Sequence, residues 1–152
     1  IRQHRSIRRT SARIEPVKSS APLVPEFLVS DLDVSLAFYC GLLGFTVRYD
    51  RPENRFAYLE REGAELMLEE PVGRTFLAAR LEAPFGRGVN LQIQVSDLNA
   101  ILTPLETASV LLFSPQEQVS YRREQDTVLQ RQCVVQDPDG YLLRFAQLVA
   151  QE

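Results

Sequence analysis

The chain has 152 residues, of which 45% are hydrophobic and 24% charged, values typical of a single folded domain with its own core. The formal net charge is −3, but residues 1–20 carry six Arg or Lys against one Glu, a net of +5 that leaves −8 for the rest. The acidic remainder argues against nucleic acid as a partner and suits a cationic small molecule better. No apolar run is long enough to cross a membrane, and none follows the basic N-terminus as in a secretory signal, so we expect no membrane association and a cytoplasmic protein.

Residues 1–20 lack a clear hydrophobic period, and we interpret them as a flexible basic arm. The next part of the chain predicts a strand, a helix and three further strands. Asp31 is suited to cap the helix, which should end near Gly44, and Glu62-Gly63 should form a hairpin turn. The strands are expected over residues 22–29, 45–49, 55–60 and 65–69.

Residues 71–88 contain several Pro and Gly residues and are expected to be a linker. At Asn90 a second alternating segment begins, in which amide side chains alternate with apolar ones as far as Val95. Asp97 should cap a helix that continues to about Thr107. Strands are then predicted over residues 110–113, 128–135 and 141–146, with residues 114–124 as a polar loop.

One short motif occurs twice. Val29-Ser30-Asp31-Leu32-Asp33 returns as Val95-Ser96-Asp97-Leu98-Asn99, an offset of 66 residues, and each copy joins a predicted strand to a predicted helix. A fixed offset indicates two copies of one supersecondary unit. We therefore expect one structural domain over residues 21–150, built from a first module (21–70), the linker and a second module (89–150).

These motifs carry a family resemblance. Together with Phe38-Tyr39, Leu43-Gly44-Phe45 and the segment Asp137-Pro138-Asp139-Gly140-Tyr141 that ends the second unit, they resemble the vicinal oxygen chelate superfamily of glyoxalases, bleomycin resistance proteins and dioxygenases. The resemblance runs from about Leu23 to Gln147. It implies an α+β fold of two βαβββ repeats, which form a curved mixed sheet with a half-barrel cleft and helices outside. Members commonly form dimers, so the resemblance also implies a homodimer.

The resemblance also implies where a metal would be bound. Enzymes of this superfamily hold a divalent cation with side chains from the first and last strands of each unit, and those positions fall here on Val24, Met67, Asn90 and Arg144. The only histidine, His4, lies in the arm. We therefore expect no metal and no cofactor, as in the metal-free, bleomycin-resistance-like branch. A shift of two residues in the alignment would instead bring Glu26, Glu65 or Glu69 into such a site.

Strand alternation suggests which side chains face the cleft. Carboxylates there would bind an ammonium or guanidinium group, amides would orient the ligand, and aromatic rings would stack on it. Two alternatives remain open: Glu69 and Arg144 form an internal ion pair, or Phe56 and Tyr58 only pack within the sheet or a dimer. The predicted ligand-binding residues are Glu26, Phe56, Tyr58, Met67, Glu69, Asn90, Gln92, Phe113 and Arg144.

The predicted function is that of a metal-free binding protein that resembles bleomycin resistance protein and sequesters a cationic aromatic antibiotic or a similar small molecule. No catalytic residues are expected, because a Ser-His-Asp or Cys-His arrangement requires a histidine outside the arm. One alternative is a glyoxalase-like lyase or isomerase, or a dioxygenase, with a rearranged metal site. Another is an interaction module whose basic arm binds an acidic partner.

Overall fold

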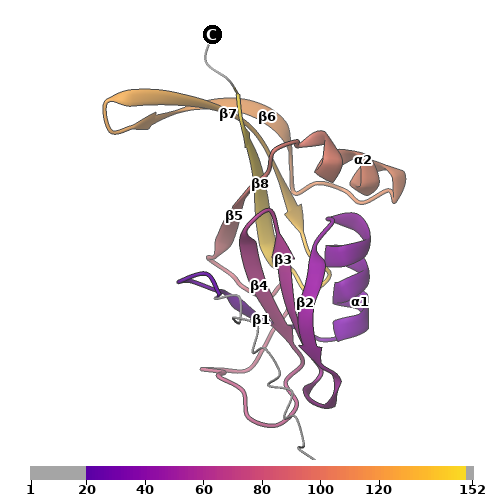
Figure 1. The fold of residues 1–152 in the computed structure, drawn as a ribbon. Coiled ribbons are helices and arrows are strands. Elements are labelled where there is room, and N and C mark those ends of the chain that lie inside the picture. The colour runs from indigo at the N-terminus through magenta and orange to yellow at the C-terminus, as the bar shows by residue number, and fades with distance from the viewer. Residues whose placement is uncertain (1–19, 150–152) are drawn as a thin grey trace, which may run out of the picture.

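The structure, a computed structural model, describes residues 20–149, which form eight strands in two four-stranded sheets (Figure 1). The predicted arm, except for Ser20, and His4 lie outside the described residues. The first repeat contains β1 (Glu26–Leu28), α1 (Leu32–Leu36), the π-helical η1 (Ala37–Leu42), β2 (Thr46–Arg51), the short 3₁₀-helix η2 (Pro52–Asn54), β3 (Phe56–Arg61) and β4 (Ala64–Glu69). The second contains β5 (Asn90–Gln94), α2 (Asn99–Thr107), β6 (Ser114–Arg123), β7 (Asp126–Gln136) and β8 (Leu142–Leu148).

The two repeats have the same topology. The strand orders are β1-β4-β3-β2 and β5-β8-β7-β6, with the first and last strands of each repeat parallel and the other neighbours antiparallel. This confirms the α+β class and the two βαβββ units. Strand pairing in the described part of the chain stays within each repeat, so no closed barrel forms. Residues 70–89 between the repeats contain no helix or strand.

The largest error of the sequence prediction concerns the second repeat. Residues 114–124 were expected to be a loop, but β6 is a ten-residue strand that pairs with β7 in a long hairpin, which extends beyond the rest of its sheet (Figure 1). Most of β6 is exposed on both faces, so its side chains show no hydrophobic period. The expected strand over residues 110–113 is absent, and β1 has three residues where residues 22–29 were predicted.

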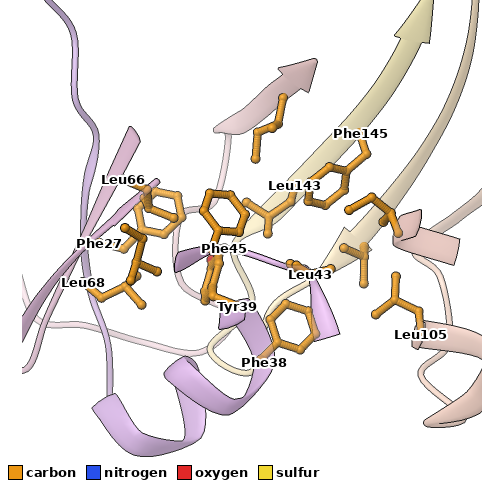
Figure 2. Close-up of a cluster of buried hydrophobic side chains, with 14 of the residues drawn as sticks. Phe27, Phe38, Tyr39, Leu43, Phe45, Leu66, Leu68, Leu105, Leu143 and Phe145 are labelled. Atoms are coloured by element: carbon orange, nitrogen blue, oxygen red, sulfur yellow. The ribbon is translucent and has the colours of Figure 1, made fainter. Parts of the chain in front are cut away.

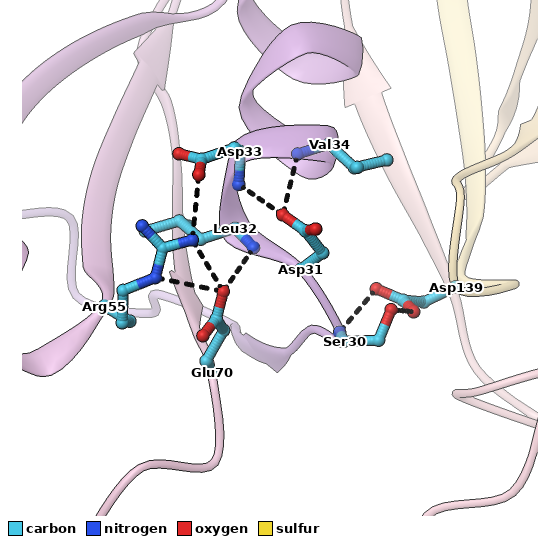
Figure 3. A network of polar contacts seen from close by, with 8 residues as sticks. All are labelled: Ser30, Asp31, Leu32, Asp33, Val34, Arg55, Glu70 and Asp139. Atoms are coloured by element: carbon cyan, nitrogen blue, oxygen red, sulfur yellow. Dashed lines mark hydrogen bonds and ion pairs between the residues drawn. The ribbon is translucent and has the colours of Figure 1, made fainter.

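At the start of both α-helices, a backbone N–H donates a hydrogen bond to a side chain at the end of the same repeat. The N–H of Leu32 donates to Glu70 Oε1 at 2.8 Å, and the N–H of Leu98 donates to Gln147 Oε1 at 2.8 Å. Asp31 caps α1 as predicted, accepting from the next N–H groups along the helix (Figure 3). These contacts satisfy donors that a helix leaves unpaired at its start. None of the helices in residues 20–149 is long and apolar enough to span a membrane.

A single hydrophobic core joins the two repeats. Leu43 and Phe45, which follow the first helix, lie between Leu68 of β4 on one side and Leu143 and Phe145 of β8 on the other (Figure 2). All five are buried. This core covers one face of each sheet. The opposite face of each sheet carries polar side chains, and the core fixes where these two polar faces lie.

The Asp-Pro-Asp-Gly turn binds the two repeats together. Asp137 is 4% exposed, and its Oδ1 accepts the N–H groups of Asp139, Gly140 and Tyr141 at 2.9 Å each. Its Oδ2 accepts the hydroxyl of Tyr39, from the first repeat, at 2.8 Å. Gly140 has φ +108°, and a Cβ there would lie 2.7 Å from the Cα of Pro84, so the turn requires glycine.

Replacing Tyr39 by Phe should remove this contact between the repeats without leaving a cavity. Hydrogen bonds to buried charged groups contribute about 1.5–3 kcal/mol, so we expect a loss of that size in the free energy of unfolding measured with urea. Tyr49→Phe serves as a matched control, because Tyr49 is 44% exposed, and it should change stability by less than about 0.5 kcal/mol. Equal effects of the two substitutions would contradict a special role for the Tyr39 hydroxyl.

Candidate functional site

The first sheet collects most of its predicted site residues on one face. Strand register places Glu26, Met67 and Tyr58 side by side in one row across β1, β4 and β3, and Glu69 beside Phe56 in the next. Their neighbours in the strands, such as Leu66 and Leu68, belong to the hydrophobic core on the opposite face. We call this surface the acidic-aromatic face.

The aromatic rings of the acidic-aromatic face are covered by side chains of β2. Phe56 and Tyr58 are 1% and 2% exposed. The guanidinium carbon of Arg51 lies 3.7 Å from the ring centroid of Phe56, and the Tyr49 ring stacks on Tyr58 with centroids 4.8 Å apart. Tyr49 and Arg51 were not predicted from the sequence, because the register of β2 and β3 shifts between Val47 and Tyr49.

The carboxylates of Glu26 and Glu69 interact directly. Partial burial raises the pKa of Glu26, and a hydrogen bond and charge repulsion from Glu69 raise it further, while the charge of Arg51 opposes the shift. Two neighbouring carboxylates repel each other when both are charged, and a cation placed between them relieves that repulsion. The pair therefore gives the acidic-aromatic face an affinity for positive charge.

Glu65 lies on the same face but is held by contacts within the protein. It accepts the guanidinium of Arg48 at 2.9 Å, the N–H of Ala21 at 2.8 Å and the hydroxyl of Tyr58. The side chain of Glu65 is 6% exposed. We therefore assign Glu65 to positioning Tyr58 and the segment before β1.

The second sheet carries a different set of polar side chains on the corresponding face. Register pairs Gln92 of β5 with Arg144 of β8, and Asn90 lies one step along the same face. A cavity of about 320 Å³ opens there, lined by Gln92, Gln94, Tyr121, Arg122, Arg123, Val128, Gln130, Arg144 and Leu148. Tyr121 was not predicted as a site residue because β6 was taken for a loop, although Gln130 and Gln132, two residues apart in the predicted strand over residues 128–135, could have indicated this face.

A second cavity, of about 360 Å³, lies between residues of β4 and β5, and Glu65, Asn90 and Gln92 are among its lining residues together with core residues such as Phe45 and Leu66. The predicted residue Phe113 lines neither cavity. It precedes β6 and is 62% exposed, and its N–H donates to the carbonyl of Val134 at 2.8 Å.

The expected alternative of an internal ion pair between Glu69 and Arg144 does not apply to this structure. Register places Glu69 beside Leu28 and Phe56 in the first sheet and Arg144 in the second. No ion pair joins these two side chains in the part of the chain that the structure describes.

Equivalent positions of the two repeats have different chemistry. In register, Met67 of β4 corresponds to Arg144 of β8, and Phe56 of β3 corresponds to Gln132 of β7. The repeat offset of 66 also relates Glu26 to Gln92. One fold unit therefore presents an acidic and aromatic surface in its first copy and an amide-rich, basic surface in its second.

The positions where the superfamily's enzymes bind a metal do not fit a divalent cation. Met67 and Asn90 offer a thioether and an amide, and Arg144 would place a positive charge at the centre of the site. If the alignment is shifted by two residues, Glu26, Glu65 and Glu69 become the possible metal ligands. Glu65 already binds Arg48, so only the carboxylates of Glu26 and Glu69 could bind a cation. Within residues 20–149, no three His, Cys, Asp or Glu side chains gather as a metal site would require.

Comparison with known proteins defines the family. A family model described as "Glyoxalase/Bleomycin resistance protein/Dioxygenase superfamily" matches residues 23–145. The chain belongs to this superfamily. A comparison with curated protein sequences gives no match.

Solved structures place the chain among diverse members. It is 37% identical to a glyoxalase/bleomycin resistance protein/dioxygenase superfamily member from Vibrio splendidus, covering 82% of this chain and 95% of that one, with a TM-score of 0.39. TioX from a Micromonospora species is 18% identical, covers 87% and 100%, and has a TM-score of 0.66. Lactoylglutathione lyase from Agrobacterium tumefaciens is 18% identical, covers 86% and 95%, and has a TM-score of 0.55. The last two comparisons support the fold alone.

The Glu26–Glu69 interaction can be tested by titration. Replacing Glu69 by Gln removes the charge repulsion, so the raised pKa of Glu26 should fall toward its ordinary value in an NMR titration of the side-chain carboxyl carbons. Glu82→Gln, in an exposed residue of the linker, should leave the titration of Glu26 unchanged. An unchanged Glu26 titration in the Glu69 variant would show that the two carboxylates do not interact.

Proposed function

We propose that this protein binds a cationic aromatic small molecule on the acidic-aromatic face without changing it chemically. The observation that carries the proposal is that this face already holds a cation of the protein's own. The Arg51 guanidinium lies 3.7 Å from the Phe56 ring centroid, and its charge acts on the neighbouring Glu26. A ligand with a guanidinium or ammonium group attached to a planar ring would offer the same interactions.

Aromatic stacking and charge would act together on such a ligand. Tyr49, 44% exposed, presents a ring at the surface above Tyr58, where a planar ligand can stack. A cation over an aromatic ring contributes about 0.5–2 kcal/mol, more when water is excluded. The Glu26–Glu69 pair would supply the counter-charge.

Membership of the superfamily supports a drug as the ligand, since one of its named groups is the bleomycin resistance proteins. In our proposal the protein sequesters a bleomycin-like antibiotic in the cytoplasm, as a homodimer and without metal or cofactor. The enzyme alternative requires a metal, and the thioether, amide and guanidinium at the family's ligand positions favour binding over metal-dependent catalysis.

The central test is calorimetric titration of bleomycin, and of the aromatic cation 2-naphthamidine, into chelator-treated protein. Replacing Glu69 by Gln should weaken binding about tenfold or more, because a charge-assisted hydrogen bond contributes about 1.5–3 kcal/mol. The neutral isostere 2-naphthamide should bind more weakly than the amidine.

Glu82→Gln changes the net charge equally but lies on the exposed linker, and should bind both cations like the wild type. Undiminished affinity in the Glu69 variant, with its melting temperature also unchanged, would exclude the role proposed for Glu69. Absence of any saturable binding of either cation would exclude the proposed function.

Arg51 gives a second, independent test. We expect the ligand to take the place of the Arg51 guanidinium over the Phe56 ring. The apparent affinity of the protein for the ligand is then lower the more of the time Arg51 covers that ring. Arg51→Gln should therefore tighten binding of 2-naphthamidine, whereas Arg80→Gln, the same charge change in the linker, should have a smaller effect. Weaker binding in the Arg51 variant would mean that Arg51 contacts the ligand instead of competing with it.

A further inference from the structure

We propose that the second sheet carries a separate binding site for a small organic carboxylate, centred on Arg144. This site differs from the acidic-aromatic face in its strands, its charge and the ligand that it selects. It is the 320 Å³ cavity on the polar face of β5, β8, β7 and β6, and its volume lies within the range of small-molecule sites.

Arg144 has a hydrogen-bond donor without a partner. The Nε of Arg144 is buried and has no hydrogen-bond partner, although most of the polar atoms buried in a protein have one. An arginine keeps its charge throughout the physiological pH range, so this donor cannot become neutral to avoid the cost of burial. No carboxylate of the described residues forms an ion pair with this guanidinium either, so an anionic ligand that binds its terminal nitrogens from the cavity would supply the counter-charge.

The wall of the cavity carries positive charge. The cavity is lined by Arg122, Arg123 and Arg144 and by no Asp or Glu, in a protein whose overall charge is negative. Two carboxylates share the sheet face by register. Glu117 already accepts a hydrogen bond from Gln132 Nε2 at 2.8 Å, and Asp126 lies at the far end of the β6–β7 hairpin.

Hydrogen bonds between side chains hold the wall of the cavity in place. Gln132 Oε1 accepts Gln130 Nε2 at 2.9 Å and the Tyr121 hydroxyl at 3.1 Å, while its own amide is fixed by Glu117. Gln130 and Gln132 are both 5% exposed. Fixing these amides in advance reduces the entropy lost when a ligand binds.

The shape and chemistry of the cavity select a carboxylate on an apolar body. The planar guanidinium of Arg144 matches the two oxygens of a carboxylate, and Gln92, beside it in register, offers a further amide donor. The apolar part of the ligand would contact Tyr121, Val128 and Leu148. An aromatic carboxylate satisfies both requirements.

The test compares 2-naphthoate with its neutral isostere 2-naphthamide, titrated into the full chain and followed by calorimetry and NMR. We expect saturable binding of naphthoate at one site per chain and at least about tenfold weaker binding of naphthamide. Arg144→Gln should lower naphthoate affinity by about tenfold or more. Arg144→Lys should restore only part of it, because lysine keeps the charge but loses the planar fork.

Two controls separate this site from a general charge effect and from the proposed function. Arg80→Gln makes the same charge change in the exposed linker and should leave naphthoate affinity nearly unchanged. Glu69→Gln should also leave it nearly unchanged, while weakening the binding of cations. Equal affinity for naphthoate and naphthamide, or undiminished naphthoate binding in Arg144→Gln, would overturn the carboxylate site and leave the cation proposal intact.

Discussion

The structure depends most on one buried carboxylate. Asp137 organises its own turn through three backbone N–H groups and reaches the first repeat through the Tyr39 hydroxyl. Burial raises the pKa of Asp137, although each of its hydrogen bonds acts to lower it. Because this contact links the end of β7 to the first helix, it fixes how the repeats meet in the shared core. The two polar faces are positioned by that core, so Asp137 helps to define both candidate sites without contacting either.

The sequence was sufficient to predict the architecture, because the duplicated motif and the hydrophobic alternation reflect backbone geometry directly. It was not sufficient where a strand is polar on both faces, because apolar and polar side chains then do not alternate. β6 is exposed on both faces, and its hydrogen bonds to β7 cannot be recognised from its own side chains. For the same reason Tyr121 was not recognised as a site residue. Long-range pairing, which decides such cases, is not encoded in any local window.

The composition of the candidate site was partly predictable. Alternation placed Glu26, Glu69 and Phe56 correctly on one face of the first sheet. It did not predict that Arg51 would cover Phe56, because a register shift in β2 decides which side chains lie opposite β3. Nor did it separate the acidic residues from Arg144, since the assignment of strands to two sheets is a tertiary property.

The hydrogen bonds at the starts of α1 and α2 differ in their response to pH. Glu70, which holds the first helix, has a pKa lowered by its hydrogen bonds to Arg55 and to the Leu32 N–H, so its contribution to stability is lost as the pH falls through that pKa (Figure 3). Gln147 holds the second helix with an amide that does not titrate. A pH below the ordinary pKa of a glutamate should thus loosen the beginning of the first repeat before that of the second. The two copies of one unit thus differ in their response to acid as well as in the charge of their polar faces.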